Sequence, residues 1–356
     1  MSDNRGLSGS AWRKARFTAL CLMASAATLG SSACSKSNKP DCSSPEVFCV
    51  GVVTDVGKVD DKSFNQSSWE GVLKAKKDLG AVTQYIETTD PKDYSKNIAT
   101  FAEEKYDVVV TVGFALGETT RAAAAQFPDT KFIGVDQFQP PGSEKKNLAG
   151  LVFPEDHAGY LVGALAALTS KTGKIGAVLA TDAVPPVWRY GEGFKVGAKA
   201  AKPSIDLTVV YHNDVGIDKT FSDPEWGKTT ALSMIDKGVD VVFGGGGKTG
   251  NGALIGAASK GVYGIGVDTD QYFTVPEAQK YLLSSAMKLL DEGVFDLLKQ
   301  AKEGKFPSGN SVGKAGNAPY HDLAAQVPDD VKSKLEGMKK DLQSGAIKTN
   351  VAPTKP

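Results

Sequence analysis

Short apolar runs of strand length alternate along this chain with longer amphipathic stretches of helix length. The apolar runs lie at residues 48–54, 82–87, 107–112, 131–136, 174–180, 207–212, 239–244 and 263–268. Amphipathic stretches between them lie at residues 67–79, 93–104, 157–170 and 190–200. Regular alternation of strands and helices predicts an α/β fold in which helices cover parallel sheets.

The same arrangement occurs in both halves of the chain. A run that begins at Asp107 is followed 29 residues later by Asp136, and a run that begins at Asp240 is followed 28 residues later by Asp268. A chain of 356 residues is also long enough for about two domains. The repeat therefore predicts two Rossmann-like lobes with parallel sheets.

Four aspartates follow apolar runs, namely Asp55, Asp136, Asp182 and Asp268. Ligands of open α/β sheets bind beyond the carboxyl ends of the strands, so we expect these side chains to face a cleft that the two lobes share. The alternative for any one of them is that the carboxylate caps the next helix.

The N-terminal segment is typical of a secretory signal peptide, which we expect over residues 1–33. Basic residues at positions 13, 14 and 16 precede an apolar run at 17–30, and small residues come after it. The apolar run is too short to cross a hydrocarbon core of about 30 Å as a stable helix.

Cys34 follows these small residues as the lipidated cysteine of a bacterial lipobox does, although Ser31 stands where a lipobox usually has Leu. We expect Cys34 to be diacylated and residues 34–46 to tether the folded domain to the outer side of the cell membrane. The alternative is a secreted protein that is cleaved near this point. Cys42 and Cys49 would then lie in an oxidising compartment, which favours a local disulfide between them over two free thiols.

Charge and composition argue against nucleic acids and metals as partners. The 41 Lys and Arg residues balance 41 Asp and Glu residues, and no basic cluster is present to hold a phosphate backbone. Three His and four Cys residues, without a Cys-x-x-Cys or His-x-x-x-His pair, offer little for a zinc site made of protein ligands. We expect no cofactor.

A glycine-rich segment at residues 244–250 invites two nucleotide-binding interpretations. A P-loop would need a glycine at position 242, which is Val242, so that match fails. Gly245, Gly247 and Gly250 fit the dinucleotide fingerprint, with Asp268 following 18 residues later. Such matches are common wherever a strand leads into a helix, and in either case glycines let a ligand approach backbone N–H groups.

Phe64 and Asn65 come after the first expected strand. An aromatic ring beside an amide at the carboxyl end of a strand suits a planar polar ligand, because the ring stacks and the amide both donates and accepts. The alternative is that Phe64 packs beneath its own loop.

Motifs through nearly the whole chain after the leader resemble those of the basic membrane protein (BMP) family, substrate-binding lipoproteins of the purine nucleoside receptor A type. The matching segments are Thr-Asp-Val-Gly at 54–57, Ser-Phe-Asn at 63–65, Gly-Val-Asp-Gln at 134–137, 156–163, 191–197, Phe-Ser-Asp-Pro at 221–224, the glycine loop from 244, Gly-Val-Asp at 266–268, Asp-Gln at 270–271 and Ser-Ser-Ala-Met-Lys at 284–288. Trp188 and Tyr190 depart from the family, which often has an aliphatic residue and Phe there.

The resemblance implies a type I periplasmic-binding-protein fold, with two lobes joined by three crossing segments and a purine nucleoside in the cleft. Phe64 and Phe221 would sandwich the base from opposite lobes. Asn65 and Asp136 would bind the edge of the base, and Asp268 would accept the two ribose hydroxyls.

The same resemblance implies further ligand contacts. Lys288 and the backbone at Gly246 and Gly247 would add donors, and Asp55 would shape the first-lobe loop or touch the ligand. Without the resemblance, Lys288 together with the charged residues at 291, 292 and 299 would indicate a solvated helix face.

We expect an N-terminal lobe at residues 47–155 with a return segment at about 283–320, a C-terminal lobe at 156–282, and a helical extension at 321–356. The expected function is that of an extracytoplasmic lipoprotein that binds purine nucleosides and delivers them to the permease subunits of an ABC-type importer. Catalysis is not expected, because no nucleophile, base and orienting acid can be assigned and the His residues at 157, 212 and 321 have no evident partners. The alternatives are a receptor of the same fold for a sugar or other small solute, and an envelope enzyme that processes nucleosides or uses a nucleotide cofactor.

Overall fold

Two six-stranded sheets organise residues 41–356, the part of the chain that the computed structural model describes. In the first sheet the strand order is β11-β5-β4-β3-β1-β2 and all neighbouring strands are parallel. Its strands are β1 (Cys49–Val56), β2 (Val82–Thr88), β3 (Val108–Val112), β4 (Lys131–Val135), β5 (Leu148–Val152) and β11 (Gly309–Val312).

The second sheet repeats this order as β12-β10-β9-β8-β6-β7, with only β12 antiparallel to its neighbour. Its strands are β6 (Lys174–Leu179), β7 (Asp206–Tyr211), β8 (Val241–Gly245), β9 (Tyr263–Asp268), β10 (Leu282–Lys288) and β12 (Ala315–Asn317). The two-lobed α/β fold expected from the repeat is thereby confirmed.

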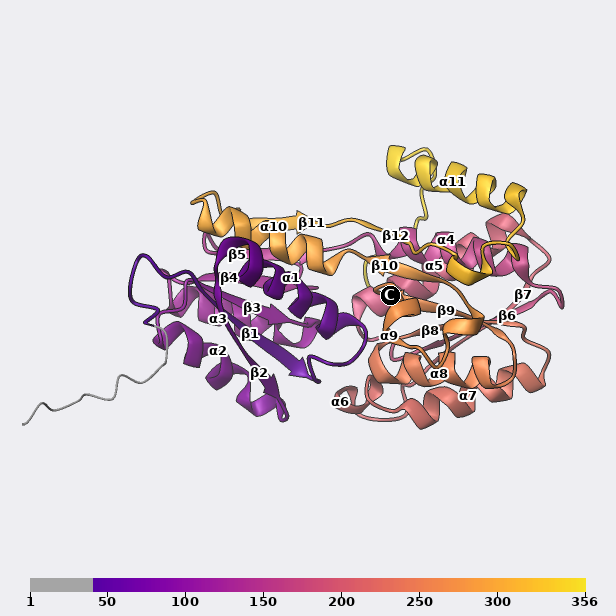
Figure 1. Cartoon of the computed structure of the whole chain (residues 1–356), viewed down its shortest axis with the longest axis horizontal. Coiled ribbons are helices and arrows are strands. Elements are labelled where there is room, and N and C mark those ends of the chain that lie inside the picture. The colour runs from indigo at the N-terminus through magenta and orange to yellow at the C-terminus, as the bar shows by residue number, and fades with distance from the viewer. Residues whose placement is uncertain (1–40) are drawn as a thin grey trace, which may run out of the picture. The chain divides into compact units, whose positions relative to one another are not determined.

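Helices cover both faces of each sheet (Figure 1). The first sheet lies between α1 (Phe64–Leu79) with α10 (Leu290–Lys302) and α2 (Tyr94–Glu103) with α3 (Gly117–Gln126). The second lies between α4 (Glu155–Thr169) with α5 (Pro185–Ala201) and α7 (Pro224–Asp236) with α8 (Gly247–Ser259). Short helices α6 (Ile217–Thr220) and α9 (Gln271–Thr274) come after β7 and β9, and α11 (Asp329–Ser344) packs against α4. Burial on both faces explains why the central strands are continuous apolar runs.

All eight strands expected from the sequence are present, as are the four helices. Four strands were not anticipated, namely β5, β10, β11 and β12. Strands β11 and β12 are short and have the sequences GNSV and AGN, so they carry no apolar pattern that could signal a strand. Helix α5 begins five residues earlier than expected, because Pro185 occupies the first turn, where its missing N–H costs no hydrogen bond.

The chain crosses between the sheets three times, after β5, after β10 and between β11 and β12. The expected return to the first lobe at about residue 283 is six residues too early. Strand β10 pairs with β9 and β12 in the second sheet, and α10 is the first element to pack on the first lobe again. The error arose because β10 lies directly before the crossing and its sequence runs into that of α10 without a turn signal.

Helices α4 and α5 approach each other unusually closely, and glycines make this possible. A Cβ atom on Gly159 or Gly163 would overlap the backbone of α5, and one on Gly193 or Gly197 would overlap the backbone of α4. This contact fixes the start of α5 against the start of α4, at the edge of the second sheet where the chain first crosses.

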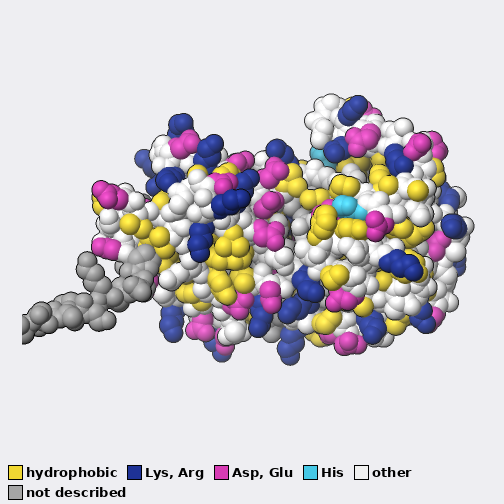
Figure 2. Space-filling view, in the orientation of Figure 1, with side chains coloured by type: hydrophobic (Ala, Val, Ile, Leu, Met, Phe, Trp, Pro, Cys, Tyr) yellow, Lys and Arg dark blue, Asp and Glu magenta, His cyan; other side chains and the backbone are white. Residues whose placement is uncertain are grey.

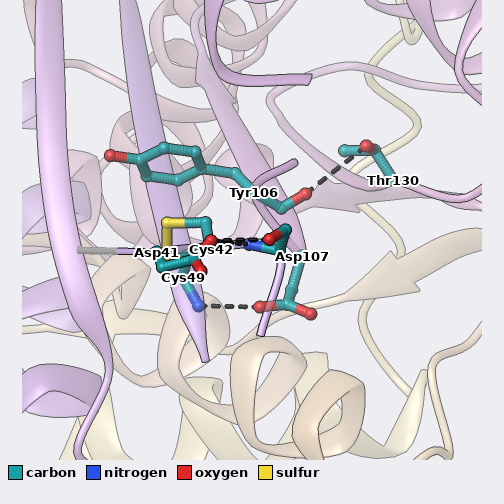
Figure 3. The surroundings of a disulfide bond; sticks show 7 residues. Asp41, Cys42, Cys49, Tyr106, Asp107 and Thr130 are labelled. Carbon is teal, nitrogen blue, oxygen red and sulfur yellow. Dashed lines mark hydrogen bonds between the residues drawn. A yellow bond between two sulfur atoms is a disulfide. The ribbon is translucent and has the colours of Figure 1, made fainter. Parts of the chain in front are cut away.

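A disulfide joins Cys42 and Cys49 at the amino end of β1 (Figure 3). Cys49 N donates to Asp107 Oδ2 at 2.7 Å, so the same corner is also tied to β3. Both cysteines lie in the apolar cluster beneath α2. The expected tether at 34–46 therefore ends before Cys42, and its earlier part lies outside the described residues, as do the expected signal peptide and Cys34.

The disulfide joins cysteines that are seven residues apart and so restricts a short loop of the unfolded chain. Its loss should therefore lower the free energy of unfolding by about 2 kcal/mol. Urea unfolding of Cys42→Ser/Cys49→Ser, followed by tryptophan fluorescence, measures this loss. Wild-type protein in reductant should match the double variant, and reductant should not affect the double variant. Equal stability of oxidised and reduced wild type would contradict the expectation.

Candidate functional site

A cavity of about 480 Å³ lies at the carboxyl ends of the two sheets, with walls from both lobes. Its polar floor includes residues at the ends of β4, β9 and β10. Figure 2 shows Asp and Glu side chains gathered on the surface where the two lobes meet. A cleft at the strand ends is where ligands of this sheet type bind.

All nine residues that the sequence suggested as ligand contacts line this one cavity. They are Asp55, Phe64, Asn65, Asp136, Phe221, Gly246, Gly247, Asp268 and Lys288.

Lys288 is the last residue of β10 and is 2% exposed. Its Nζ atom lies 2.5 Å from Asp136 Oδ2, 3.7 Å from Asp268 Oδ1 and 3.8 Å from Glu155 Oε1. Burial alone would lower the pKa of this ammonium group, but the three carboxylates together raise it above its ordinary value. The interpretation of Lys288 as part of a solvated helix face is therefore wrong.

Asp136 and Asp268 occupy equivalent places in the two lobes, directly after β4 and at the end of β9. Both have left-handed backbones, with φ of 60° and 66°. Beneath each lies a buried glutamine: Gln137 Nε2 donates to Gly113 O at 3.0 Å, and Gln271 Oε1 accepts from Val267 N at 2.9 Å. Because left-handed backbones cost energy in residues other than glycine, two such bends at matched positions point to a function.

Asp55 is the penultimate residue of β1, and its carboxylate lies against Gly113, where any Cβ atom would overlap it. Burial raises the pKa of Asp55 to about 7, helped by the nearby charges of Asp61 and Asp136. Asn65 Oδ1 and Asp136 Oδ1 are buried without a hydrogen-bond partner. Unpaired buried acceptors are costly, so this part of the wall is suited to a ligand that brings donors.

Phe64 and Phe221 face the cavity from opposite lobes. Phe64 is the first residue of α1, and the Nζ of Lys288 lies 4.7 Å from the centroid of its ring. Phe221 comes directly after α6 and its carbonyl lies close to Gly247. Both rings are half-buried and also touch the cores of their lobes, so packing and ligand contact are compatible here.

The glycine loop turns from β8 into α8. Gly246 and Gly247 have φ of 98° and 58°, conformations that suit glycine, and the backbone of Gly245 lies too close to Gly250 for a side chain there. These glycines bring the start of α8 against the cavity, so that its backbone N–H groups are available to a ligand.

The sequence interpretation gave no role to several residues at or beside the cavity, and three of them bear directly on its charge and geometry. Asp61 accepts hydrogen bonds from the backbone N–H groups of Ser63, Asn65 and Gln66 and so caps α1. Burial raises its pKa to about 6. An aspartate just before a helix is a recognised capping signal, and this residue could have been identified from it.

Glu155 and Tyr190 are the other two. Burial raises the pKa of Glu155 to about 7, although Lys288 and Arg189 oppose the rise. The hydroxyl of Tyr190 lies 3.3 Å from Ala286 O and its ring lies beside Lys288. Glu155 gives no distinct signal in the sequence, because an acidic residue in the first turn of a helix is ordinary.

Asp182 was expected in the cleft and does not line it. Its carboxylate accepts instead from Asn213 Nδ2 at 3.0 Å and from Lys355 Nζ at 2.7 Å. The loop after β6 turns this side chain toward the C-terminal segment, so the expectation that an aspartate after a strand faces the cleft is wrong for Asp182.

The histidines have partners that the sequence did not reveal. His212 is buried, contacts Asp214 and Asp223, and stacks on Trp226. His321 Nε2 lies 2.7 Å from Asp270 Oδ2. None of the three lines the cavity. Within residues 41–356 no cluster of three or more His, Cys, Asp or Glu side chains could hold a metal ion, and no helix there has the length and apolar character to span a membrane.

Comparison with known proteins agrees with this geometry. The chain is 34% identical to a CD4+ T-cell-stimulating antigen of Listeria monocytogenes, over 94% of this chain and 97% of that protein. It is 32% identical to a protein of Lactococcus lactis named ABC transporter nucleoside-binding protein BmpA, over 74% and 77% of the two chains.

A solved ABC transporter solute-binding protein from Aeropyrum pernix superposes with a TM-score of 0.73 at 25% identity, covering 85% of this chain and 92% of that one. The expected periplasmic-binding-protein fold is thus confirmed. Residues 48–313 match the Bmp family, described as ABC transporter substrate-binding protein PnrA-like. The chain therefore belongs to the Bmp family of PnrA-like ABC transporter substrate-binding proteins.

Proposed function

We propose that the protein binds a purine nucleoside between its lobes and presents it to the permease subunits of an ABC importer. One observation carries the proposal: two aromatic rings, Phe64 and Phe221, face a single cavity from opposite lobes beside buried acceptors that have no partner. Planar rings suit a base, and unpaired acceptors suit its amino and N–H groups. The printed name of the Lactococcus relative supports this choice of ligand.

The polar groups divide naturally between base and ribose. Asn65 and Asp136 belong to the first lobe, as Phe64 does, and would bind the edge of the base. Asp268 belongs to the second lobe and would accept both ribose hydroxyls, since one carboxylate can accept from two adjacent donors. Backbone N–H groups at Gly246 and Gly247 would complete the contacts, with Lys288 holding the carboxylates in place.

The charges of the wall favour an uncharged ligand that is rich in donors. Five carboxyl side chains line the cavity against three lysines; the carboxyl groups are those of Asp55, Asp61, Glu87, Asp136 and Asp268. A phosphate group would meet this excess of negative charge, so we expect nucleosides to bind better than nucleotides.

Binding would be coupled to closure because each lobe supplies one ring and one set of hydrogen bonds. A ligand held by both lobes stabilises the arrangement in which the lobes meet. The family and the fold neighbours are binding proteins, and we propose no reaction at this site.

Replacing either ring by alanine should weaken binding of adenosine or guanosine. Stacking on a base contributes about 1 to 3 kcal/mol per ring, or roughly fivefold to 150-fold in Kd. Calorimetric titration of Phe64→Ala and Phe221→Ala measures the loss, Tyr at either position should keep most of the affinity, and Phe273→Ala, an exposed residue outside the cavity, is the control. Unchanged affinity together with a lower melting temperature would mean that the two rings only pack in the cores of their lobes. If the wild type bound a sugar more tightly than it binds nucleosides, the protein would be a sugar receptor instead.

The ribose assignment separates Asp268 from Asp136. Asp268→Asn should raise the Kd of adenosine by about tenfold or more, because a hydrogen bond to a charged group is worth roughly 1.5 to 3 kcal/mol. The Kd of 2′,3′-dideoxyadenosine, which lacks both ribose hydroxyls, should change much less. Asp136→Asn should weaken both compounds alike. Asp182→Ala, a strand-end aspartate outside the cavity, is the control. An equal loss for both compounds in Asp268→Asn would refute the ribose role.

We further propose that Cys34 carries the lipid anchor. Labelled palmitate fed to cells should enter the wild-type protein, and Cys34→Ser should not incorporate it and should appear in the soluble extracytoplasmic fraction. Cys42→Ser/Cys49→Ser is the control and should still be labelled. Equal labelling of wild type and Cys34→Ser would exclude this anchor.

A further inference from the structure

The segment Asp61–Ser63, between β1 and α1, belongs to the first lobe and makes four hydrogen bonds to the second. Asn251 Nδ2 donates to Asp61 O at 3.0 Å. Lys62 O accepts from Thr274 Oγ1 at 2.8 Å and from Gln271 Nε2 at 3.2 Å. Ser63 Oγ donates to Asp268 Oδ2 at 2.9 Å. We call this segment the clasp.

The clasp is held rigidly by its own lobe. The carboxylate of Asp61 accepts three backbone N–H groups at the start of α1, at 2.9 to 3.1 Å. Lys62 has a left-handed backbone with φ of 62°, which costs a lysine roughly 1 kcal/mol. This bend aims the carbonyl of Lys62 at the second lobe, and a strained residue that is used in this way points to a function.

The second lobe presents a prepared surface to the clasp. Gln271 is fully buried, and its side chain accepts from Val267 N and donates to Asn251 Oδ1 at 2.7 Å. Asn251 and Gln271 therefore hold each other in the orientation that receives the two clasp carbonyls. Their donors are fixed before the lobes meet, so closure costs little side-chain entropy.

The clasp is continuous with both halves of the site. Phe64 and Asn65 come directly after it in the chain, and Asp268 accepts the hydroxyl of Ser63. This bond occupies one oxygen of Asp268, while the other lies 3.7 Å from Lys288 Nζ. The orientation of the Asp268 carboxylate is thus set from across the cleft.

We propose that the clasp closes the lobes on each other and that Ser63 is a positioning residue, which orients Asp268 for the ligand only when the lobes are closed. The clasp then contributes to the free energy of closure whether or not a ligand is present. The observed affinity equals the affinity of the closed form multiplied by the fraction of protein that is closed before the ligand binds. The effect on affinity rests on the proposed ligand site, whereas the effect on the ligand-free protein does not.

Weakening the clasp at Thr274 should reduce the affinity for every ligand by the same factor, because Thr274 does not line the cavity. Thr274→Val removes one donor to Lys62 O and should raise the Kd of adenosine and of adenine alike by about two- to tenfold. Thr274→Ser keeps the hydroxyl and should restore wild-type values. Thr100→Val on α2, whose hydroxyl bonds only within its own helix, is the matched control.

Small-angle scattering of the ligand-free proteins tests closure independently of any ligand. Thr274→Val should have a larger radius of gyration than the wild type, Thr274→Ser and Thr100→Val should not, and saturating adenosine should remove the difference. Ser63→Ala should add a loss of about tenfold or more for adenosine with a smaller loss for adenine, because only the nucleoside needs an oriented Asp268. An unchanged radius together with unchanged affinity in Thr274→Val, or equal losses for both compounds in Ser63→Ala, would overturn the proposal. If no nucleoside bound the wild type, the scattering comparison would still decide whether the clasp closes the lobes.

Discussion

The structure depends on one buried charge, the ammonium group of Lys288. A fully buried cation is tolerated only when carboxylates surround it, and here Asp136, Asp268 and Glu155 approach it from three elements. Lys288 belongs to the second sheet and Asp136 to the first, so this ion pair joins the strand ends of both lobes at the floor of the cavity. Asp136 and Asp268 both have left-handed backbones where their carboxylates approach the ammonium group of Lys288.

Buried carboxyl groups at and beside the cavity, Glu155 among them, destabilise the folded protein when they ionise. Burial raises the pKa of Asp55 and Glu155 to about 7 and of Asp61 to about 6, so between about pH 4 and 7 these three groups bind more protons in the folded protein than in the unfolded chain. In that window their contribution to the free energy of unfolding falls as pH rises, and above it the full cost of ionising them is present. A ligand that supplies hydrogen-bond donors offsets part of this cost, which is one source of affinity.

The fold could be predicted because its central strands are buried on both faces and are followed by aspartates at a repeated spacing. The site was predictable where side chains stand at the ends of those strands, as at Asp136 and Asp268. Prediction failed where the outcome depended on tertiary contacts: Asp182 turns away to Lys355, and Glu155 looks like any acid in a first helical turn. Charge pattern alone placed Lys288 on the surface, and only the family resemblance pointed to it as a site residue. The spacing of apolar residues indicates which face of a helix or strand is buried. It does not indicate which carboxylates, distant in the sequence, will contact a given lysine.

Two kinds of contact join the lobes, and they differ in how easily they can change. The pair of Lys288 and Asp136 is charged and buried, so removing Lys288 would leave three buried carboxylates without their cation, at a cost of several kcal/mol. The clasp contacts of Lys62 O are neutral hydrogen bonds worth about 1 kcal/mol each. Substitutions at residues such as Thr274 can therefore adjust the closing equilibrium in small steps. Because Thr274 lies outside the cavity, overall affinity can change in this way while the side chains that line the cavity, and the selectivity we propose for them, stay the same.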